Sequence, residues 1–427
     1  MKVALLGNTC NNNFALLRYL LDLNIDAHLY LYSNEGKSHE NPIHAPSWDS
    51  VDIKLYQKSI SCLDIPNGLV SVIGRPDKLT LPLDLSNFSN ELSEYDICVG
   101  SGLTPAIFRR MNKVLDIFYP YGVGIEWLAD NECKKKLETL NLQWPLRKLL
   151  FYTQLDGLRK TRKVINWLPG ITEDTLKKYS IPFSYLHIPA YYLESKPISG
   201  INERKHLDKT LLEKISNKQT FKIFSFMRHI WVFDKNKNDI STWPTCNKNN
   251  NLLIIGFKHF IDQNITRECK LFLSSWGDNV EDSKKLIAEL NLQPYIEWIP
   301  LMPRSIITYI LSEYADMAVG EFIISPGESW GSTAWECIAH GVPFMQSVNY
   351  KKHDFKNLWG YDLPPQILNV QNSDDVTRHI SDIFNQSRNG KIKCPKNSIW
   401  FKEYNGHALA KEWIKLFNHI ILQKNKV

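Results

Sequence analysis

The sequence predicts an α/β protein with two doubly wound parallel sheets. Within the first 32 residues, an apolar strand at residues 2–7 precedes a helical pattern and an alternating strand at residues 27–32. Strand, helix and strand in this order form a βαβ unit, which is typical of parallel sheets. A second series of strands and helices begins at residue 221. At 427 residues the chain is too long for one ordinary core and fits two domains of roughly 200 residues each.

The first domain is expected to span residues 1–200. After the βαβ unit, further strands are expected at residues 69–73, 96–100 and 114–119. The turn after the first strand contains Gly7 but lacks the Gly-x-Gly-x-x-Gly pattern of dinucleotide-binding sites. A nicotinamide or flavin cofactor is therefore disfavoured.

A charged stretch with proline and glycine separates the two series and predicts a linker at residues 201–218. The second domain is expected at residues 219–397, and residues 398–427 are expected to form a terminal helical segment. The strands expected in the second domain are 221–226, 270–273, 295–299, 317–319 and 344–346. The helices expected there are 252–260, 282–290, 304–313, 333–340 and 373–385, with a final amphipathic helix at 407–422.

The composition is that of a packed globular protein, with 43% hydrophobic and 12% aromatic residues. No apolar run approaches the length of about 18 residues that a membrane span requires. The apolar stretch at the start of the sequence is too short for a signal peptide, so a cytoplasmic location is expected. The eight cysteines are scattered without a Cys-x-x-Cys pair, which predicts reduced thiols and no zinc site.

The positive net charge of +6 is concentrated in residues 134–163, which contain nine basic and two acidic residues. Leucines recur through this segment at roughly helical spacing, which indicates amphipathic basic helices. Such helices suit an anionic membrane surface, and would place the protein peripherally on the inner face of the membrane. Nucleic acid is disfavoured as a partner, because the segment lacks the pattern of aromatic residues and glycines between basic residues that nucleic-acid-binding motifs have. A solvated basic face is the remaining alternative.

Two carboxylates, Glu328 and Glu336, stand eight residues apart across a Gly-Ser-Thr turn that opens a helix. The backbone N–H groups near Gly331, Ser332 and Thr333 have no helical partners and point outward, where they can bind an anion. A ligand with a central diphosphate and a sugar at each end fits this pattern. The diphosphate would lie on the helix start, and each carboxylate would bind one sugar. The pattern therefore favours a nucleotide sugar.

This segment resembles the Glu-x7-Glu signature of retaining glycosyltransferases with the GT-B fold, especially glycosyltransferase family 4. Ser325 before the signature and the segment 341–343 after the helix also lie where that family has them. The resemblance implies that Glu328 orients the hydroxyls of the donor sugar and that Glu336 binds the ribose. It also implies two Rossmann-like domains facing across a cleft, with the last helix crossing back to the first domain. A solvated helix with two surface glutamates is the alternative.

Two cations of the second domain extend the resemblance. Arg228 follows the strand at 221–226, and Lys248 precedes the helix at 252–260, as in the family's diphosphate-binding arginine and lysine. Asn249 departs from the pattern, because the family has glycine there. Fixed cations stabilise the charge that builds on a departing diphosphate more than they stabilise the ground state. No Asp-x-Asp pair is placed to hold a metal, so neither metal nor cofactor is expected. The alternative is that both are surface charges.

The remaining candidates are assigned to the site more loosely. Gly277 lies in a turn similar to the family's donor-binding turn after the second strand. The candidates for the cleft or acceptor side of the first domain are Asn11, Ser101, Gly102, Gly122 and Glu126. Loop solvation or helix capping is the stronger interpretation for Asn11, and Glu126 departs by two residues from the family's acidic position.

The sequence therefore predicts a retaining glycosyltransferase that moves a sugar from a nucleotide-diphosphate donor to a growing surface polysaccharide or a lipid-linked glycan. An inverting transferase or a sugar-nucleotide epimerase of the same fold is one alternative. A non-catalytic module that binds a nucleotide sugar or a membrane is another. The base, the sugar, the acceptor and the linkage cannot be read from the residues.

Overall fold

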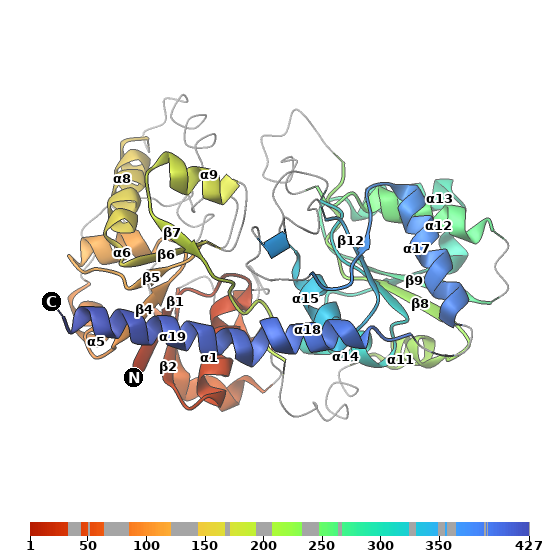
Figure 1. The fold of residues 1–427 in the computed structure, drawn as a ribbon. Coiled ribbons are helices and arrows are strands. Elements are labelled where there is room, and N and C mark those ends of the chain that lie inside the picture. The colour runs from red at the N-terminus through yellow and green to blue at the C-terminus, as the bar shows by residue number, and fades with distance from the viewer. Residues whose placement is uncertain are drawn as a thin grey trace. The chain divides into compact units, whose positions relative to one another are not determined.

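The computed structural model describes the chain except for fourteen short gaps (Figure 1). The gaps are residues 33–43, 50–51, 64–84, 121–143, 167–170, 194–206, 233–246, 264–266, 324–329, 349–354, 357–363, 388–389, 391 and 427. The internal contacts divide the chain into two compact units. Unit 1 comprises residues 1–192, 356–361 and 404–427, and unit 2 comprises residues 193–355 and 362–403.

Unit 1 is built on a parallel sheet of seven strands in the order β3-β2-β1-β4-β5-β6-β7. The strands are β1 (Lys2–Leu6), β2 (Asp26–Tyr32), β3 (Ile60–Leu63), β4 (Ile97–Gly100), β5 (Ile117–Phe118), β6 (Lys163–Asn166) and β7 (Phe183–Tyr185). The principal helices are α1 (Asn12–Asp22), α2 (Pro46–Asp49), α5 (Ser86–Leu92), α6 (Thr104–Arg110), α8 (Trp144–Lys160), α9 (Ile171–Lys178) and α19 (Gly406–Lys424). The strand order reverses between β1 and β4, so the switch point of this sheet lies there.

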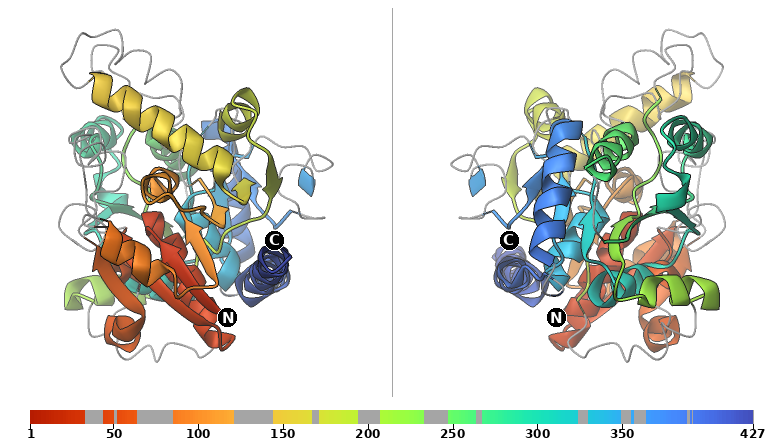
Figure 2. Two further views of the ribbon diagram at one scale, coloured as in Figure 1. Left: turned by 90° about the vertical axis from the view of Figure 1, so that its left-hand side faces the viewer. Right: turned by 90° about the vertical axis from the view of Figure 1, so that its right-hand side faces the viewer.

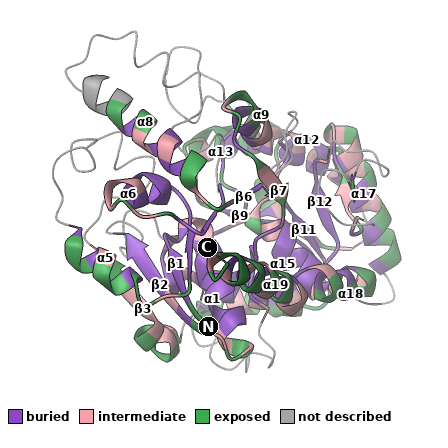
Figure 3. Cartoon of the chain, turned by 60° about the vertical axis from the view of Figure 1, so that its left-hand side comes forward, coloured by how far each residue is buried: buried purple, intermediate pink, exposed green. Residues whose placement is uncertain are grey.

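Both faces of this sheet are covered, because the buried residues of β1 and β2 are aliphatic or aromatic on each face. Val3 and Leu5 pack on one face with α1 and α19, whereas Ala4 and Leu6 pack on the other with α5, α6 and α8 (Figures 1 and 2). The alternation follows from the two-residue period of a strand. On α19 the buried Trp413 donates an indole hydrogen bond to a backbone carbonyl of unit 1 (2.8 Å). The other side of α19 is largely exposed (Figure 3).

Unit 2 is built on a parallel sheet of six strands in the order β10-β9-β8-β11-β12-β13. The strands are β8 (Phe221–Ser225), β9 (Cys269–Ser274), β10 (Ile296–Ile299), β11 (Met317–Val319), β12 (Phe344–Gln346) and β13 (Leu368–Asn369). The principal helices are α11 (Lys209–Ser216), α12 (Asn250–Ile261), α13 (Val280–Glu289), α14 (Arg304–Glu313), α15 (Ser332–His340), α17 (Ser373–Gln386) and α18 (Pro395–Tyr404). The switch point of this sheet lies between β8 and β11.

The helices α12 and α17 pack closely against each other in unit 2. A Cβ atom added at Gly256 of α12 would lie 2.5 Å from the Cβ atom of Val376 on α17. Only glycine permits this approach, which buries Phe257 and Ile380 in the same core as β8. This contact fixes the position of α12. Because α12 begins beside the loop that follows β8, the contact also fixes the start of the helix at that end of the sheet.

The predicted α/β fold class is confirmed, and the expected elements are found wherever the structure describes them. The expected strand at residues 69–73 lies outside the described residues. The sequence patterns missed the strands β3, β6, β7 and β13 and the helices α2, α5, α6, α9, α11 and α18. The helix α11 lies within the region predicted as a linker. Its side chain Ile215 is buried, which gives this short helix a packed side.

The basic segment is described only from residue 144 onward, where it forms α8 and the start of β6. Leu155 and Leu158 of α8 are buried in the core against α6, so these leucines do not face a membrane. Leu149 and Tyr152 are about half exposed, at 51% and 54%. Among the helices that the structure describes, none has the length and apolar character to cross a membrane.

Candidate functional site

At the switch point of unit 2, a lysine and a glutamate form an ion pair. Lys248 lies two residues before α12, and Glu321 lies two residues after β11. The distance between Lys248 Nζ and Glu321 Oε1 is 2.7 Å, and the two side chains are 12% and 22% exposed. Ligands of doubly wound sheets bind outside the carboxyl ends of the strands at this point.

The backbone around Lys248 is fixed by contacts with both neighbouring loops. The Lys248 N–H donates to the Ile230 carbonyl of the loop after β8 (2.7 Å). Asn249 Nδ2 donates to the Phe322 carbonyl of the loop after β11 (2.6 Å). Asn249 has a φ of +48°, a left-handed conformation that glycine and asparagine adopt most readily. Asn249 therefore adopts a backbone conformation that a glycine at this position could also adopt.

The loop that carries Glu321 is fixed by Gln346 at the end of β12. The Glu321 N–H donates to Gln346 Oε1 (2.8 Å), and the Glu321 carbonyl accepts from the Ser347 N–H (3.1 Å). A Cβ atom at Gly320 would lie 2.2 Å from Gln346 Oε1, so a larger residue there would displace the Gln346 side chain. Gln346 is 1% exposed, and a buried amide holds its partners well because it has no water to exchange with.

The start of α15 lies against the carboxyl group of Glu321. Gly331 is the N-cap residue of α15 and has no side chain that could cap this helix end. A Cβ atom at Gly331 would lie 2.6 Å from Glu321 Cδ. We call the group formed by Lys248, Glu321 and the first residues of α15, Gly331 to Thr333, the Lys248–Glu321 corner. It combines a cation with the partly positive N-terminal end of a helix.

Arg228 lies on the other side of the end of β8. Its side chain is exposed, and its guanidinium carbon is 5.5 Å from the ring centroid of Trp276, in the loop after β9. The two loops are interlocked, since the His229 N–H donates to the Trp276 carbonyl (2.7 Å). Gly277 has a φ of +117°, and a Cβ atom there would lie 2.5 Å from the His229 backbone. The predicted role of Gly277 as a donor-binding residue stays a prediction, but its conformation clearly supports the loop carrying Arg228.

His229, next to Arg228, is a structural residue in this loop. Its Nδ1 atom lies 2.8 Å from Ser283 Oγ, which also accepts a hydrogen bond from Trp231 Nε1 (2.8 Å). Burial lowers the pKa of His229 to about 4. The imidazole is therefore neutral near pH 7, and its role here is to hold the loop.

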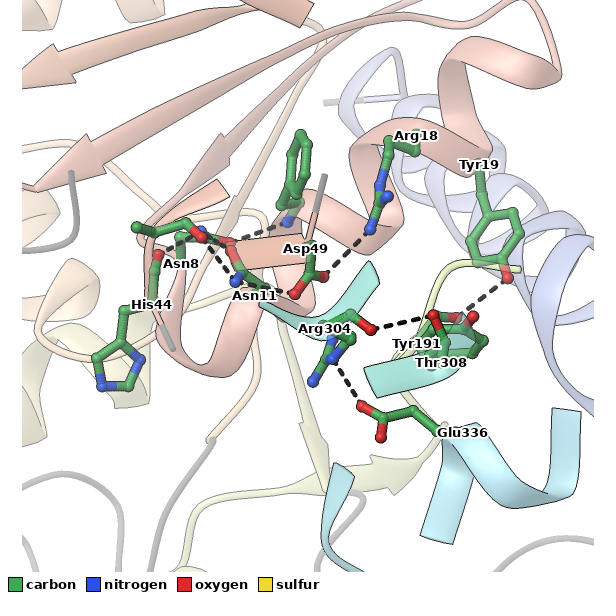
Figure 4. A network of polar contacts seen from close by, with 12 residues as sticks. Asn8, Asn11, Arg18, Tyr19, His44, Asp49, Tyr191, Arg304, Thr308 and Glu336 are labelled. Carbon is green, nitrogen blue, oxygen red and sulfur yellow. Dashed lines mark hydrogen bonds and ion pairs between the residues drawn. The ribbon is translucent and has the colours of Figure 1, made fainter. Parts of the chain in front are cut away.

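Glu336, the second carboxylate of the signature, is buried on α15. Its Oε1 atom lies 2.9 Å from Nε of Arg304, the first residue of α14, and the two side chains are 3% and 5% exposed (Figure 4). Sequence reasoning missed Arg304. A buried carboxylate needs a cation as its partner, so burial of Glu336 would have predicted such a partner, but not which cation it is. Ribose binding by Glu336 stays a prediction, and it would have to share this carboxylate with Arg304.

In unit 1, Asn11 belongs to a buried polar network after β1. Asn11 is fully buried and has a φ of +58°. It accepts a hydrogen bond from Asn8 Nδ2 (2.7 Å) and donates to Asp49 Oδ1 (3.1 Å), as Figure 4 shows. The buried Arg18 pairs with Asp49 through Nη2 and Oδ2 (3.1 Å). These contacts give Asn11 a structural role in the loop.

The guanidinium of Arg18 also lies between two aromatic rings. Its central carbon is 4.4 Å from the centroid of Phe14 and 4.3 Å from that of Tyr192. An arginine held by a carboxylate and two rings is well compensated for its burial. The network therefore anchors the first loop of unit 1 to α1.

Ser101 and Gly102 lie after β4, at the switch point of unit 1, and both are buried. The Ser101 N–H donates to the Leu6 carbonyl (3.1 Å), and the Gly102 carbonyl accepts from Gln154 Nε2 of α8 (2.9 Å). In the structure, both residues connect neighbouring elements of the core.

Four predicted site residues lie outside the described residues, so their roles stay predictions. These are Gly122, Glu126, Ser325 and Glu328. Among the residues that the structure does describe, no group of three or more histidine, cysteine, aspartate or glutamate residues could hold a metal. The expectation that no metal takes part likewise stays a prediction.

No protein-family model and no curated protein sequence matches the chain. Solved structures match over nearly the whole length. Sucrose-phosphate synthase from Thermosynechococcus elongatus has a TM-score of 0.58 at 11% identity, over 99% of this chain and 100% of that chain. WaaG, a glycosyltransferase involved in lipopolysaccharide biosynthesis, has a TM-score of 0.56 at 13% identity, over 97% and 99%.

A UDP-N-acetylglucosamine 2-epimerase is also similar, with a TM-score of 0.52 at 10% identity, over 100% of this chain and 97% of that chain. At these identities the likeness shows the fold alone, which is the GT-B fold with two Rossmann-like sheets. Because transferases and an epimerase share it, the chemistry has to be argued from the site.

Proposed function

We propose that the protein is a retaining glycosyltransferase that uses a nucleotide-diphosphate sugar as its donor. The observation that carries the proposal is that Lys248 and the start of α15 both lie against Glu321, at the switch point of unit 2. A diphosphate needs cations and free N–H groups, and the Lys248–Glu321 corner supplies both. The solved glycosyltransferases of the same fold support the same class of reaction.

The proposed reaction breaks the bond between the anomeric carbon of the sugar and the diphosphate oxygen. Negative charge develops on the leaving nucleotide, and we assign its stabilisation to Arg228 and Lys248, without a metal. The N–H groups of Ser332 and Thr333 would bind the same diphosphate. Glu328 is assigned to the hydroxyls of the donor sugar. The acceptor hydroxyl attacks the anomeric carbon from the face that the nucleotide leaves, and its proton passes to an oxygen of the departing diphosphate.

The acceptor is proposed to be a growing surface polysaccharide or a lipid-linked glycan. A lipid-linked acceptor would place the protein at an anionic membrane surface, with residues 134–163 as the contact. Within that segment the exposed Leu149 and Tyr152 and the exposed cations Arg159 and Lys160 are the described residues that fit such a contact. Flotation with vesicles that contain or lack phosphatidylglycerol tests this part, and flotation with neither kind would exclude it.

The first experiment is a binding screen with uridine, guanosine, adenosine and cytidine diphosphate, read as a shift in melting temperature. One of the four is expected to raise the melting temperature. Sugar transfer is then measured with the matching nucleotide sugars, and the anomeric configuration of the product is determined by NMR. Retention supports the proposal, whereas inversion contradicts the retaining mechanism.

The Glu328→Ala variant separates catalysis from binding. It should lower turnover far more than it lowers the affinity for the nucleoside diphosphate, because the residue is assigned to the sugar. Turnover close to that of the native protein would refute this assignment.

An epimerase is the second candidate, because the same fold occurs in a UDP-N-acetylglucosamine 2-epimerase. Incubation of the nucleotide sugar without an acceptor distinguishes the two. Conversion to an epimer of the intact nucleotide sugar would support epimerisation, whereas a transferase requires the acceptor or releases sugar slowly to water.

A further inference from the structure

The carboxylate of Glu321 lies where the proposed function places the donor's diphosphate. It is 2.7 Å from Lys248 Nζ, the cation assigned to that diphosphate. Its Cδ atom is also adjacent to Gly331, at the start of α15, where the N-cap residue has no side chain. A cation and a helix N-terminus are the two features that favour an anion, and Glu321 contacts both. The corner therefore contains an anion supplied by the chain itself.

The position of Glu321 is built into the fold. The buried Gln346 accepts a hydrogen bond from the Glu321 N–H, and the Ser347 N–H donates to the Glu321 carbonyl. These two bonds fix the backbone of Glu321 next to the end of β12. Glycine at position 331 leaves the space that the carboxyl group fills, because any Cβ atom there would collide with it. The backbone is fixed, whereas the side chain is 22% exposed and has a route toward solvent.

A carboxylate and a diphosphate cannot both bind Lys248 in this corner without weakening each other's interaction with it. Each would contact Lys248, and two anions a few ångströms apart repel each other. Bound diphosphate would therefore weaken the ion pair of Lys248 with Glu321, and departure of the diphosphate would let it form again. The cation is compensated and oriented in both states, because one anion replaces the other.

We infer that Glu321 is an internal competitor of the nucleoside diphosphate for Lys248, which weakens nucleotide binding and speeds nucleotide release. The inference rests on the proposed function and deepens it, because it assigns Glu321 a role in exchange of the nucleotide. A merely structural ion pair would behave differently. Its loss would lower stability and would leave nucleotide affinity unchanged or reduce it.

The test compares Glu321→Gln with the native protein by calorimetric titration of uridine, guanosine, adenosine and cytidine diphosphate. Glutamine has the same shape as glutamate but carries no charge. The variant is expected to bind the preferred nucleotide about tenfold more tightly. The gain should appear mainly as slower dissociation, and it should shrink at high salt because the pair is partly exposed.

Glu297→Gln is the matched control. Glu297 lies on β10 of the same unit and pairs with Lys214 at 2.6 Å, and its side chain is 21% exposed, close to the 22% of Glu321. This variant should leave the affinity unchanged. Glu321→Ala is a second variant that should also bind more tightly, and thermal unfolding without nucleotide verifies that each variant folds.

Unchanged or weaker binding by Glu321→Gln would overturn the inference. An equal gain in Glu321→Gln and Glu297→Gln would also overturn it, because the effect would then be one of overall charge. If the native protein and all three variants bind none of the four nucleotides, the proposed function itself fails, and the inference fails with it.

Discussion

Replacing Lys248 with alanine changes the net charge of the Lys248–Glu321 corner from zero to −1. The nucleotide loses a charge-assisted hydrogen bond, which contributes about 1.5–3 kcal/mol. It also meets the Glu321 carboxylate without its cation, and repulsion between partly exposed charges adds about 1 kcal/mol. The expected loss is therefore about 2.5–4 kcal/mol, which corresponds to an affinity about 60 to 700 times weaker.

The assay is calorimetric titration of the preferred nucleoside diphosphate into each variant. Lys214→Ala is the control, because Lys214 pairs with a glutamate of the same unit on β10. The double variant Lys248→Ala with Glu321→Gln removes the repulsion and should recover about fivefold of the lost affinity. Binding by Lys248→Ala within twofold of the native value would refute the reasoning. A double variant that binds no better than the single one would refute the part assigned to Glu321.

Three further predictions concern the loops that support the two switch points. Asp49→Asn leaves Arg18 buried without its carboxylate, so chemical denaturation should show the free energy of unfolding of unit 1 reduced by about 3–5 kcal/mol; a loss no larger than that of Glu297→Gln would contradict this. Gly277→Ala places a side chain at a φ of +117° and against backbone atoms, which should destabilise unit 2 by about 2–4 kcal/mol and weaken nucleotide binding; an unchanged denaturation midpoint would count against it. Because the pKa of His229 is about 4 in the fold and about 6.5 unfolded, the unfolded chain binds a proton that the fold does not, so His229 by itself should lower the free energy of unfolding by up to about 1.4 kcal/mol per unit as pH drops from 6.5 to 4. His229→Gln should reduce the pH slope of the native protein by this amount, and an unchanged slope would assign it to other groups such as His44 and His340, whose pKa values burial also lowers to about 4.

The fold could be predicted because its main strands and helices have clear patterns. The strand at residues 2–7 and the series after residue 221 place βαβ units in both halves, and parallel sheets follow. Strands of two or three residues, such as β7 and β13, are too short to show a period. The sequence also could not show which side of α8 is buried, because leucines at helical spacing fit a core as well as a membrane surface. In the structure, Leu155 and Leu158 pack in the core against α6.

The site could be predicted only where motifs are local in sequence. Lys248 and the start of α15 were predicted because each lies at a recognisable helix start. Glu321 was not, because a single glutamate after a three-residue strand has no pattern, and its partner is 73 residues away along the chain. The same holds for Arg304, which meets Glu336 only through the packing of α14 against α15. Long-range ion pairs depend on the fold and not on local spacing.

A crystal structure of the protein with its preferred nucleoside diphosphate tests the central claim most directly. We predict that a phosphate oxygen lies within hydrogen-bond distance of Lys248 Nζ, with backbone N–H groups at the start of α15 on the same phosphates. The Glu321 carboxylate should then have left its place beside Lys248. Phosphates bound away from the carboxyl ends of β8 and β11, with the Lys248–Glu321 pair intact, would contradict the account.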